Sequence, residues 1–267
     1  TLDEALAAAA RHKIALYAWA TCWTLEGADP ALITRLTREG RLMRDAAGNT
    51  LPWLCPSLPE NRTLLIDGLS ALARRGVAGI HLDYVRYPET AGCYAPATRK
   101  AFEAAHGQPV AAWPADVLPG GLLAAPFADF RRATMTAFIR EASAALRTAA
   151  PGVPLSAAVF PTPAAAAERG QAWPDWLRDG LVDFVCPMLY TESAADFNAW
   201  LDLCLAAAPA DKLVPGLGTG ADECQLEAAS AAAQIAETRR RRLAGFAFFA
   251  VDDELTGRLL PTLFPAR

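Results

Sequence analysis

Residues Gly76–Pro88 read Gly-Val-Ala-Gly-Ile-His-Leu-Asp-Tyr-Val-Arg-Tyr-Pro, and this stretch decides the fold class. A short apolar run ends abruptly at Asp83, which is followed by two tyrosines, an arginine and a strand-stopping proline. Such a run is typical of a buried parallel strand whose C-terminal end carries polar chemistry. We therefore predict a strand over Gly79–Asp83, with His81 and Asp83 on one face of the sheet.

Outward from this strand, apolar runs alternate with Ala- and Leu-rich helical runs. The predicted strands are 14–19, 79–83, 155–160, 182–190, 213–217 and 246–251, and the predicted helices are 2–12, 57–75, 127–149, 173–178, 193–208 and 224–243. Ser57 and Glu60 have the spacing of a capping box at the start of the second helix. Strict alternation of strands and helices predicts one parallel sheet covered by helices.

The fold class that follows is α/β, a (β/α)8 barrel of the TIM type. Six strands are predicted where a closed barrel has eight, so the chain is expected to lack the first two βα units. A dinucleotide-binding sheet is the structural rival, but no Gly-x-Gly-x-x-Gly motif follows a predicted strand. We expect a single domain over 1–267, with a long insertion rich in Pro, Ala and Gly around 89–126. Open sheet edges beside missing strands would favour self-association.

Composition excludes several classes of partner. A formal net charge of -4 argues against a nucleic-acid surface. The basic run Arg239–Arg242 does not change this interpretation, because it is predicted to be the solvated end of a helix. No apolar run approaches the length of a membrane span, and we expect no secretory signal within the printed residues. Six cysteines are too few for a disulfide scaffold. A Cys55–Cys93 bridge and two free thiols both remain open.

Three segments are specific enough to suggest a family. They read Trp-Leu-Cys-Pro-Ser-Leu-Pro-Glu-Asn-Arg (53–62), Gly-Ile-His-Leu-Asp-Tyr-Val-Arg-Tyr-Pro (79–88) and Phe-Val-Cys-Pro-Met-Leu-Tyr-Thr (184–191). In this order they resemble the glycoside hydrolase-like family 10 proteins, over nearly the whole chain. The resemblance implies a (β/α)8 barrel, carbohydrate-hydrolysing activity and, often, export from a bacterial cell.

Glycoside hydrolysis usually needs two carboxyl groups, one donating a proton and one acting as nucleophile or base. In a barrel, these groups come from loops and strand ends on the C-terminal face. Asp83 is the first candidate, as nucleophile or transition-state stabiliser, and we expect its side chain to stand open to solvent at the rim of the sheet. The alternative is a structural acid paired with Arg86. Glu192 and Asp252 are the candidates for the second carboxyl, although each could instead serve a helix N-terminus.

Aromatic and polar side chains near the same strand ends suit the apolar faces and hydroxyl rims of sugars. The predicted substrate contacts are Trp19, Trp23, Trp53, His81, Tyr84, Arg86, Tyr87 and Tyr190. The plainer alternative is that Trp19 and Trp53 plug the barrel mouth and that His81 is a core residue. No cofactor is required for acid–base hydrolysis, and no metal site is predicted because the three histidines lack zinc-ligand spacing.

Two other functions stay open. A non-catalytic carbohydrate-binding barrel would use the same strand ends without a productive second acid. Another barrel hydrolase, such as an esterase or amidase, would need a serine or threonine nucleophile near His81. No Gly-x-Ser-x-Gly motif supports that last alternative.

Overall fold

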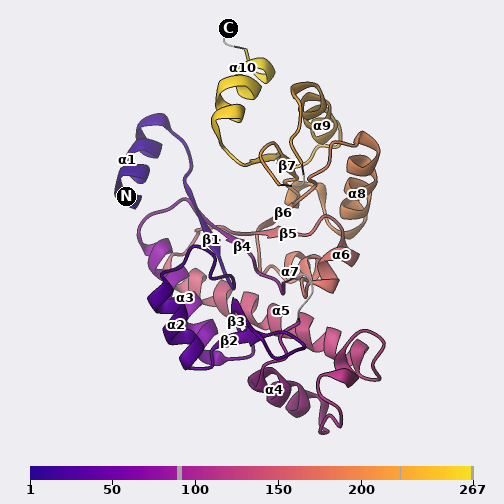
Figure 1. Cartoon of the computed structure of the whole chain (residues 1–267). Coiled ribbons are helices and arrows are strands. Elements are labelled where there is room, and N and C mark those ends of the chain that lie inside the picture. The colour runs from indigo at the N-terminus through magenta and orange to yellow at the C-terminus, as the bar shows by residue number, and fades with distance from the viewer. Residues whose placement is uncertain (89–91, 223, 266–267) are drawn as a thin grey trace. The chain divides into compact units, whose positions relative to one another are not determined.

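A computed structural model describes residues 1–88, 92–222 and 224–265 of the chain (Figure 1). The chain divides into two compact units, one made of Thr1–Leu155 and Ala167–Ala172 and the other of Ser156–Ala166 and Trp173–Arg267. Both units are α/β and contain parallel strands. The expected start of the insertion, at 89–91, lies outside the described residues.

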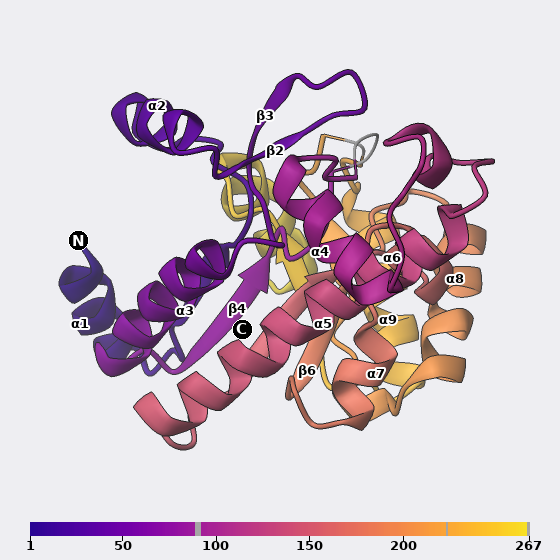
Figure 2. The same cartoon turned by 90° about the horizontal axis from the view of Figure 1, so that it is seen from below.

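The first unit begins with the predicted helix and ends with a long one. Its elements are α1 (Leu2–His12), β1 (Tyr17–Thr21), α2 (Pro30–Arg38), β2 (Leu42–Arg44), β3 (Thr50–Leu54), α3 (Pro59–Arg74), β4 (Gly79–Asp83), α4 (Pro96–His106), the 3₁₀ helix η1 (Ala115–Val117) and α5 (Ala124–Ala149). Helix α3 packs against both α5 and β4, and Figure 2 shows β4 running beside α3. The prediction of α1 and β4 is confirmed residue for residue.

Strands β1 and β4 pair in parallel and set the geometry of the site. The register places Trp19 beside His81 and pairs the last residue of β1 with Asp83. Because paired residues of parallel strands share a face, these side chains lie on one side of the sheet. On the other side, Ile80 and Leu82 are fully buried. This division confirms the alternation predicted for β4.

Gly79 begins β4 for a steric reason. A Cβ atom at this position would lie 2.1 Å from a ring carbon of Tyr17, the residue paired with it on β1. No side chain fits within such a distance, so glycine is what allows the tyrosine ring to cover the start of the strand.

Helix α3 begins differently from the prediction. Its N-cap is Leu58, no side chain caps it, and Pro59 occupies the first helical position. The hydroxyl of Ser57 is buried and makes no hydrogen bond with the described residues. The predicted capping box is therefore wrong, because a proline at the first position already supplies the required backbone angle and lacks an N–H that would need a partner.

The antiparallel hairpin of β2 and β3 was not predicted, and it reaches the end of β1. The amide of Leu54 donates to the carbonyl of Trp23 at 2.8 Å, and the amide of Leu25 donates to the carbonyl of Pro52 at 2.9 Å. These bonds fasten the hairpin to the segment that follows β1. They hold Trp53 near the C-terminal ends of the parallel strands.

The insertion is folded around an apolar core of its own. Phe102 of α4 packs with the buried side chains of Val110, Val117 and Phe127. The ring centroids of Phe102 and Phe127 are 5.1 Å apart, in an edge-to-face arrangement. The Pro- and Ala-rich composition therefore encodes a small packed subregion in its described part.

The described part of the second unit contains four strands in chain order, and the first of them, β5, begins at the last residue of the first unit's main stretch. Its elements are β5 (Leu155–Val159), α6 (Pro163–Glu168), α7 (Trp173–Arg178), β6 (Phe184–Pro187), α8 (Ala194–Ala207), the 3₁₀ helix η2 (Ala210–Lys212), β7 (Gly216–Gly218), α9 (Ala228–Arg240), β8 (Ala247–Phe249), the π-helix η3 (Leu255–Leu259) and α10 (Leu260–Leu263). Strands β5 and β6 pair in parallel, as do β7 and β8. Parallel bridges from Val185 to Leu213 and from Met188 to Gly216 join β6 to the β7 segment.

Within the described residues, six strands have a parallel partner, which matches the predicted number. The strand ends differ from the prediction. Strand β1 begins at Tyr17, and β6 ends at Pro187, three residues before Tyr190. No helix among the described residues is long and apolar enough to cross a membrane.

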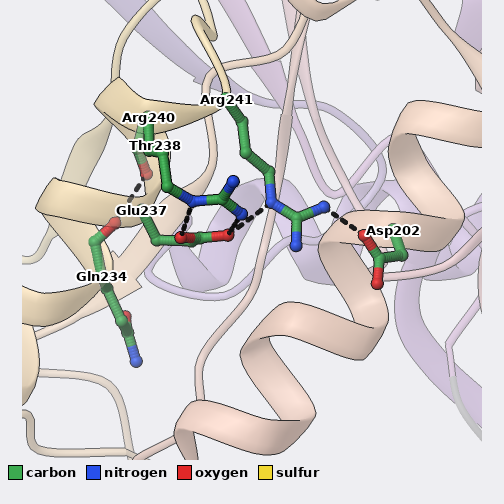
Figure 3. A network of polar contacts seen from close by, with 6 residues as sticks. All are labelled: Asp202, Gln234, Glu237, Thr238, Arg240 and Arg241. Atoms are coloured by element: carbon green, nitrogen blue, oxygen red, sulfur yellow. Dashed lines mark hydrogen bonds and ion pairs between the residues drawn. The ribbon is translucent and has the colours of Figure 1, made fainter.

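The basic run at the end of α9 is held by acidic partners (Figure 3). The Nε atoms of Arg240 and Arg241 both donate to Glu237, at 2.7 and 2.5 Å, and Arg241 also pairs with Asp202 of α8. These bonds lower the pKa of the Glu237 carboxyl to about 2. The run is a helix end, as predicted, but it links two helices as well as facing solvent.

Ala167–Ala172 belongs to the first unit because it packs on the segment that follows β4. The amide of Tyr87 donates to the carbonyl of Arg169 at 2.9 Å, and the side-chain amide of Gln171 donates to the carbonyl of Val85 at 3.4 Å. Gly170 has a φ of +82°, and a Cβ there would lie 2.9 Å from the Tyr87 ring.

Candidate active site

The carboxylate of Asp83 lies at the C-terminal end of β4 and accepts hydrogen bonds on both oxygens. The indole N–H of Trp19 donates to Oδ2 at 3.0 Å, and the backbone N–H of Tyr84 donates to Oδ1 at 2.6 Å. The carbonyl of Asp83 in turn accepts from the amide of Cys22 at 2.8 Å. Side chain and backbone of the aspartate are thus fixed by neighbours on both strands.

Tyr84 turns the chain sharply at the strand end. Its φ is +51°, in the left-handed region that bulky residues rarely occupy. The same peptide supplies the N–H that holds Oδ1 of Asp83. Strained backbone of this kind is concentrated at functional sites, where surrounding structure maintains it.

An arginine lies over two aromatic rings next to this turn. The guanidinium carbon of Arg86 is 4.8 Å from the ring centroid of Tyr84 and 5.6 Å from that of Trp53. The centroids of the two rings are 5.8 Å apart. Cation–π contact holds the guanidinium in place. The structure thus brings three of the predicted substrate contacts together in the first unit.

Burial and the charge of Asp83 act on the two titratable neighbours of the carboxylate. Burial lowers the pKa of His81, and the nearby Asp83 charge opposes that change. The Cys22 thiol has a raised pKa because it is buried and because it lies near Asp83. His81 is therefore favoured as a neutral imidazole and Cys22 as a neutral thiol.

The exposure of the site differs from the sequence expectation. Asp83 is only 9% exposed, whereas Trp19 is 56% exposed although its N–H is bonded to that carboxylate. The expectation that Asp83 stands open to solvent is therefore wrong, because the Trp19 indole and the Tyr84 backbone surround its oxygens. The open indole face beside it is of the kind on which sugar rings stack.

Two predicted substrate contacts are core residues. Trp23 is fully buried, its indole N–H lies 3.1 Å from the sulfur of Met135, and its ring packs edge-on against Phe138. Tyr87 is also fully buried, with the guanidinium of Arg131 above its ring at 4.4 Å. Both predictions are corrected, because neither ring has a surface left for a ligand.

The second unit carries an aromatic pair that includes one predicted residue. Tyr190 stacks on Phe249 with centroids 5.6 Å apart and planes at 15°. Tyr190 follows β6 and Phe249 ends β8, so both stand at C-terminal ends of parallel strands. Phe249 was missed by sequence reasoning, because the predicted strand continued to Val251 and placed Phe249 inside it.

Glu192 and Asp252 are both exposed residues of the second unit. Oδ1 of Asp252 accepts from the amide of Leu255 at 2.7 Å, which is the helix-cap role named as its alternative. Its other oxygen lies 2.6 Å from where a Cβ of Gly220 would be, so any other residue at position 220 would make the Asp252 side chain shift. Oε1 of Glu192 lies 3.5 Å from the amide of Gln225.

Metal-type ligands do not gather in the described part of the chain. No group of three or more His, Cys, Asp or Glu side chains there is arranged to hold an ion.

Comparison with solved structures identifies the fold. The chain is similar to the glycoside hydrolase domain of PgaB (BpsB) from Bordetella bronchiseptica, with a TM-score of 0.70 and 16% identity over 97% of this chain and 78% of that one. It is also similar to a β-galactosidase from Halorubrum lacusprofundi, with a TM-score of 0.71 and 15% identity over 95% of this chain and 45% of that one. A chitinase from Chromobacterium violaceum matches with a TM-score of 0.52 and 14% identity, over 98% of this chain and 96% of that one.

At these identities the likeness concerns the fold alone, which is α/β of the TIM-barrel type. The chain spans less than half the length of the β-galactosidase, at 45%. No curated protein sequence matches it. The family model described as glycosyl hydrolase-like 10 matches residues 6–234, which include the segment around Asp83. The chain therefore belongs to the glycosyl hydrolase-like 10 family.

Proposed function

We propose that this protein hydrolyses glycosidic bonds in a polysaccharide or glycoconjugate by carboxylate acid–base chemistry. One observation carries the proposal. At the C-terminal end of a parallel strand, the Asp83 carboxylate is held by a donor on each oxygen, and one of these donors is an exposed tryptophan. That strand end is where enzymes of the barrel type place their catalytic groups.

In this proposal, Asp83 acts as nucleophile or as stabiliser of the positive charge that develops on the sugar ring. Both oxygens of the carboxylate accept a hydrogen bond, which orients it for this role, and the mechanism needs a second carboxyl group. The proton donor is therefore a different group, and Glu192 or Asp252 takes that role. Each of these acids follows a parallel strand at its C-terminal end, and each is exposed.

In this proposal the substrate is bound by the predicted aromatic and polar side chains other than Trp23 and Tyr87, which belong to the core. The exposed face of Trp19 would stack on a sugar ring, and Arg86 would contact a hydroxyl or carboxylate of the substrate. Trp53, His81, Tyr84 and Tyr190 complete the proposed set. No cofactor takes part. Export from a bacterial cell is also proposed, on the strength of the family alone.

The test is a screen of bacterial and plant glycans with wild-type protein and the Asp83→Asn variant, measuring the reducing ends released. We expect wild type to cleave at least one glycan and the variant to lose turnover by more than about a thousandfold. The melting temperature of the variant should fall by only a few degrees, because asparagine keeps the size and one acceptor of the side chain. A variant that folds and retains activity would remove Asp83 from the mechanism.

The second candidate function is binding of a glycan without cleavage, and the 9% exposure of Asp83 favours it. A carboxylate enclosed by an indole and a backbone turn can hold a hydroxyl as an acceptor alone. Calorimetry on the same glycans separates the two functions. Binding by wild type with no reducing ends released, and loss of binding in Asp83→Asn, is the result expected for the binder.

A further inference from the structure

Two cysteine sulfurs are in contact beside the candidate site. The Sγ atoms of Cys55 and Cys93 are 3.3 Å apart, and both side chains are fully buried. Cys55 directly follows β3, and Cys93 comes 38 residues later, after β4 and its polar end. A disulfide has a sulfur–sulfur length of about 2.05 Å, so the pair needs to approach by only about one ångström.

The backbone on either side of this contact is anchored to one short segment. The amide of Cys55 donates to the carbonyl of Arg41 at 3.0 Å, and the amide of Tyr94, next to Cys93, donates to the carbonyl of Arg44 at 2.9 Å. Arg41 directly precedes β2, and Arg44 is its last residue. The hairpin therefore fixes the backbone next to each cysteine, and the contact between the sulfurs does not depend on the side-chain rotamers alone.

We propose that Cys55 and Cys93 form a disulfide that locks the segment following β4 to the end of β3. Other buried cysteines have different surroundings. The thiols of Cys22 and Cys204 point at the carbonyls of Ala20 and Pro161, with sulfur–oxygen distances of 3.7 and 3.1 Å. Cys22 and Cys204 therefore have carbonyl partners in place of a second sulfur.

The chemistry requires an oxidant that is itself a disulfide, as in thiol–disulfide oxidoreductases of oxidising compartments. The thiolate of Cys93 attacks that disulfide, forms a mixed disulfide and releases one thiolate. Cys55 then loses its proton and attacks the Cys93 sulfur, which releases the second thiolate of the oxidant. Two electrons and two protons pass to the oxidant, and one sulfur–sulfur bond forms in the protein.

The surroundings favour Cys93 as the attacking thiolate. Burial raises the pKa of the Cys93 thiol, but hydrogen bonds from Cys55 and Thr98 lower it more, so the net pKa falls. The Cys55 thiol has a raised pKa because of its hydrogen bond with the Cys93 sulfur and because it is buried. The hydroxyl of Thr98 lies 3.3 Å from the Cys55 sulfur. Since both sulfurs are fully buried, the oxidant reaches Cys93 when this region opens locally.

The bridge would restrain the part of the site that lies between the two cysteines in sequence. Trp53 precedes Cys55 by two residues, and Arg86 contacts both Trp53 and Tyr84. Closing a loop of this length lowers the entropy of the unfolded chain, so the melting temperature should rise by about 10 °C on oxidation. The same closure should limit opening of the turn at Tyr84.

The test uses the whole protein, refolded in a glutathione redox buffer with the poise of an oxidising compartment. The denatured, unreduced protein is alkylated and weighed by mass spectrometry, and peptide mapping then locates the bridge. We expect four alkylated cysteines of the six in the chain, and a linked peptide pair containing Cys55 and Cys93. Six alkylated cysteines, or a bridge between any other pair, would overturn the proposal.

Thermal melting with and without dithiothreitol gives a second readout that needs no variant. Wild type should lose about 10 °C in reductant, whereas Cys93→Ser should melt at the lower temperature in both conditions. Cys204→Ser is the matched control, because serine can still donate to the Pro161 carbonyl, and it should keep the response to reductant. Equal melting temperatures of wild type in both conditions would contradict the bridge even if Cys93→Ser fails to fold.

Discussion

The indole nitrogen of Trp19 and Oδ2 of Asp83 are 3.0 Å apart, although the two residues are 64 positions apart in sequence. They meet because β1 and β4 pair in parallel, with the two side chains on one face of the sheet. More than half of the tryptophan surface is exposed, at 56%, so one side chain both holds the carboxylate and offers a ring face. These two roles can be separated by substitution.

Replacing Trp19 by phenylalanine keeps an aromatic face and removes the N–H donor. If the proposed hydrolysis is correct, kcat should fall about tenfold to a hundredfold, because a hydrogen bond to a charged group contributes about 1.5–3 kcal/mol. KM should change little, whereas Trp19→Ala should also raise KM. Steady-state kinetics on the glycan found by the screen would measure both constants. Equal kcat in Trp19→Phe and wild type would show that the indole donor does not assist Asp83.

The proton donor can be identified with Glu192→Gln and Asp252→Asn. The variant that lacks the acid should cleave a natural glycan at least about a hundredfold more slowly, and lose less activity on an aryl glycoside whose leaving group needs no proton. Its pH–rate profile should also lose the limb at high pH. Asparagine remains a good helix cap, so Asp252→Asn should keep the bond to the Leu255 amide and near-normal stability. Full activity in both variants would exclude both acids.

Helix α3 contains an exposed glycine whose replacement should make the protein more stable. A Cβ at Gly68 would meet no atom within 4 Å, so Gly68→Ala should stabilise the protein by about 0.5–1 kcal/mol through lower entropy of the unfolded chain. Gly76, just after the same helix, has a φ of +86°, and Gly76→Ala should destabilise the protein by about 1 kcal/mol. Urea denaturation of the two variants should give shifts of opposite sign, and shifts of the same sign would contradict this explanation.

The pair of arginines at Glu237 predicts a dependence of stability on pH. The pKa of Glu237 is about 2 in the folded protein, below an unfolded value near 4.5. Its contribution is therefore fully present above about pH 4.5 and is lost as the pH falls towards about pH 2. Glu237→Gln should cost about 1 kcal/mol near neutral pH and less than half of that near pH 3. A deficit that stays constant over this range would show that packing, and not charge, is responsible.

The helices and strands whose bounds were predicted correctly are those marked by residues close to them in sequence. The bounds of α1 and β4 could be predicted because residues that end a helix or a strand lie next to a clear apolar pattern in both segments. Helix α2 was missed although Asp29 caps it, Pro30 occupies its first turn and its nine residues are amphipathic, so all three local signals were present in the sequence. At Ser57 a capping motif was present in the sequence but is not used in the structure. The helix begins instead at Pro59, with Leu58 as its N-cap.

The sequence indicated Asp83 as the centre of the candidate site, but it did not indicate which side chains contact Asp83. The apolar run ending in a carboxylate pointed to Asp83, but the register that brings Trp19 to it depends on pairing between distant strands. Trp23 and Tyr87 lie close in sequence to site residues and yet belong to the core, because their packing partners Met135 and Arg131 come from α5. Burial of an aromatic residue near a strand end is decided by such distant partners.

The return of Ala167–Ala172 to the first unit has a practical consequence for dissection of this protein. The chain passes from one unit to the other after Leu155, after Ala166 and again after Ala172. A single cut, whether by a protease or by a stop codon, leaves at least one unit without a stretch of its own chain. The shortest uninterrupted fragment that holds the whole first unit is therefore 1–172, and it also carries residues 156–166 of the second unit.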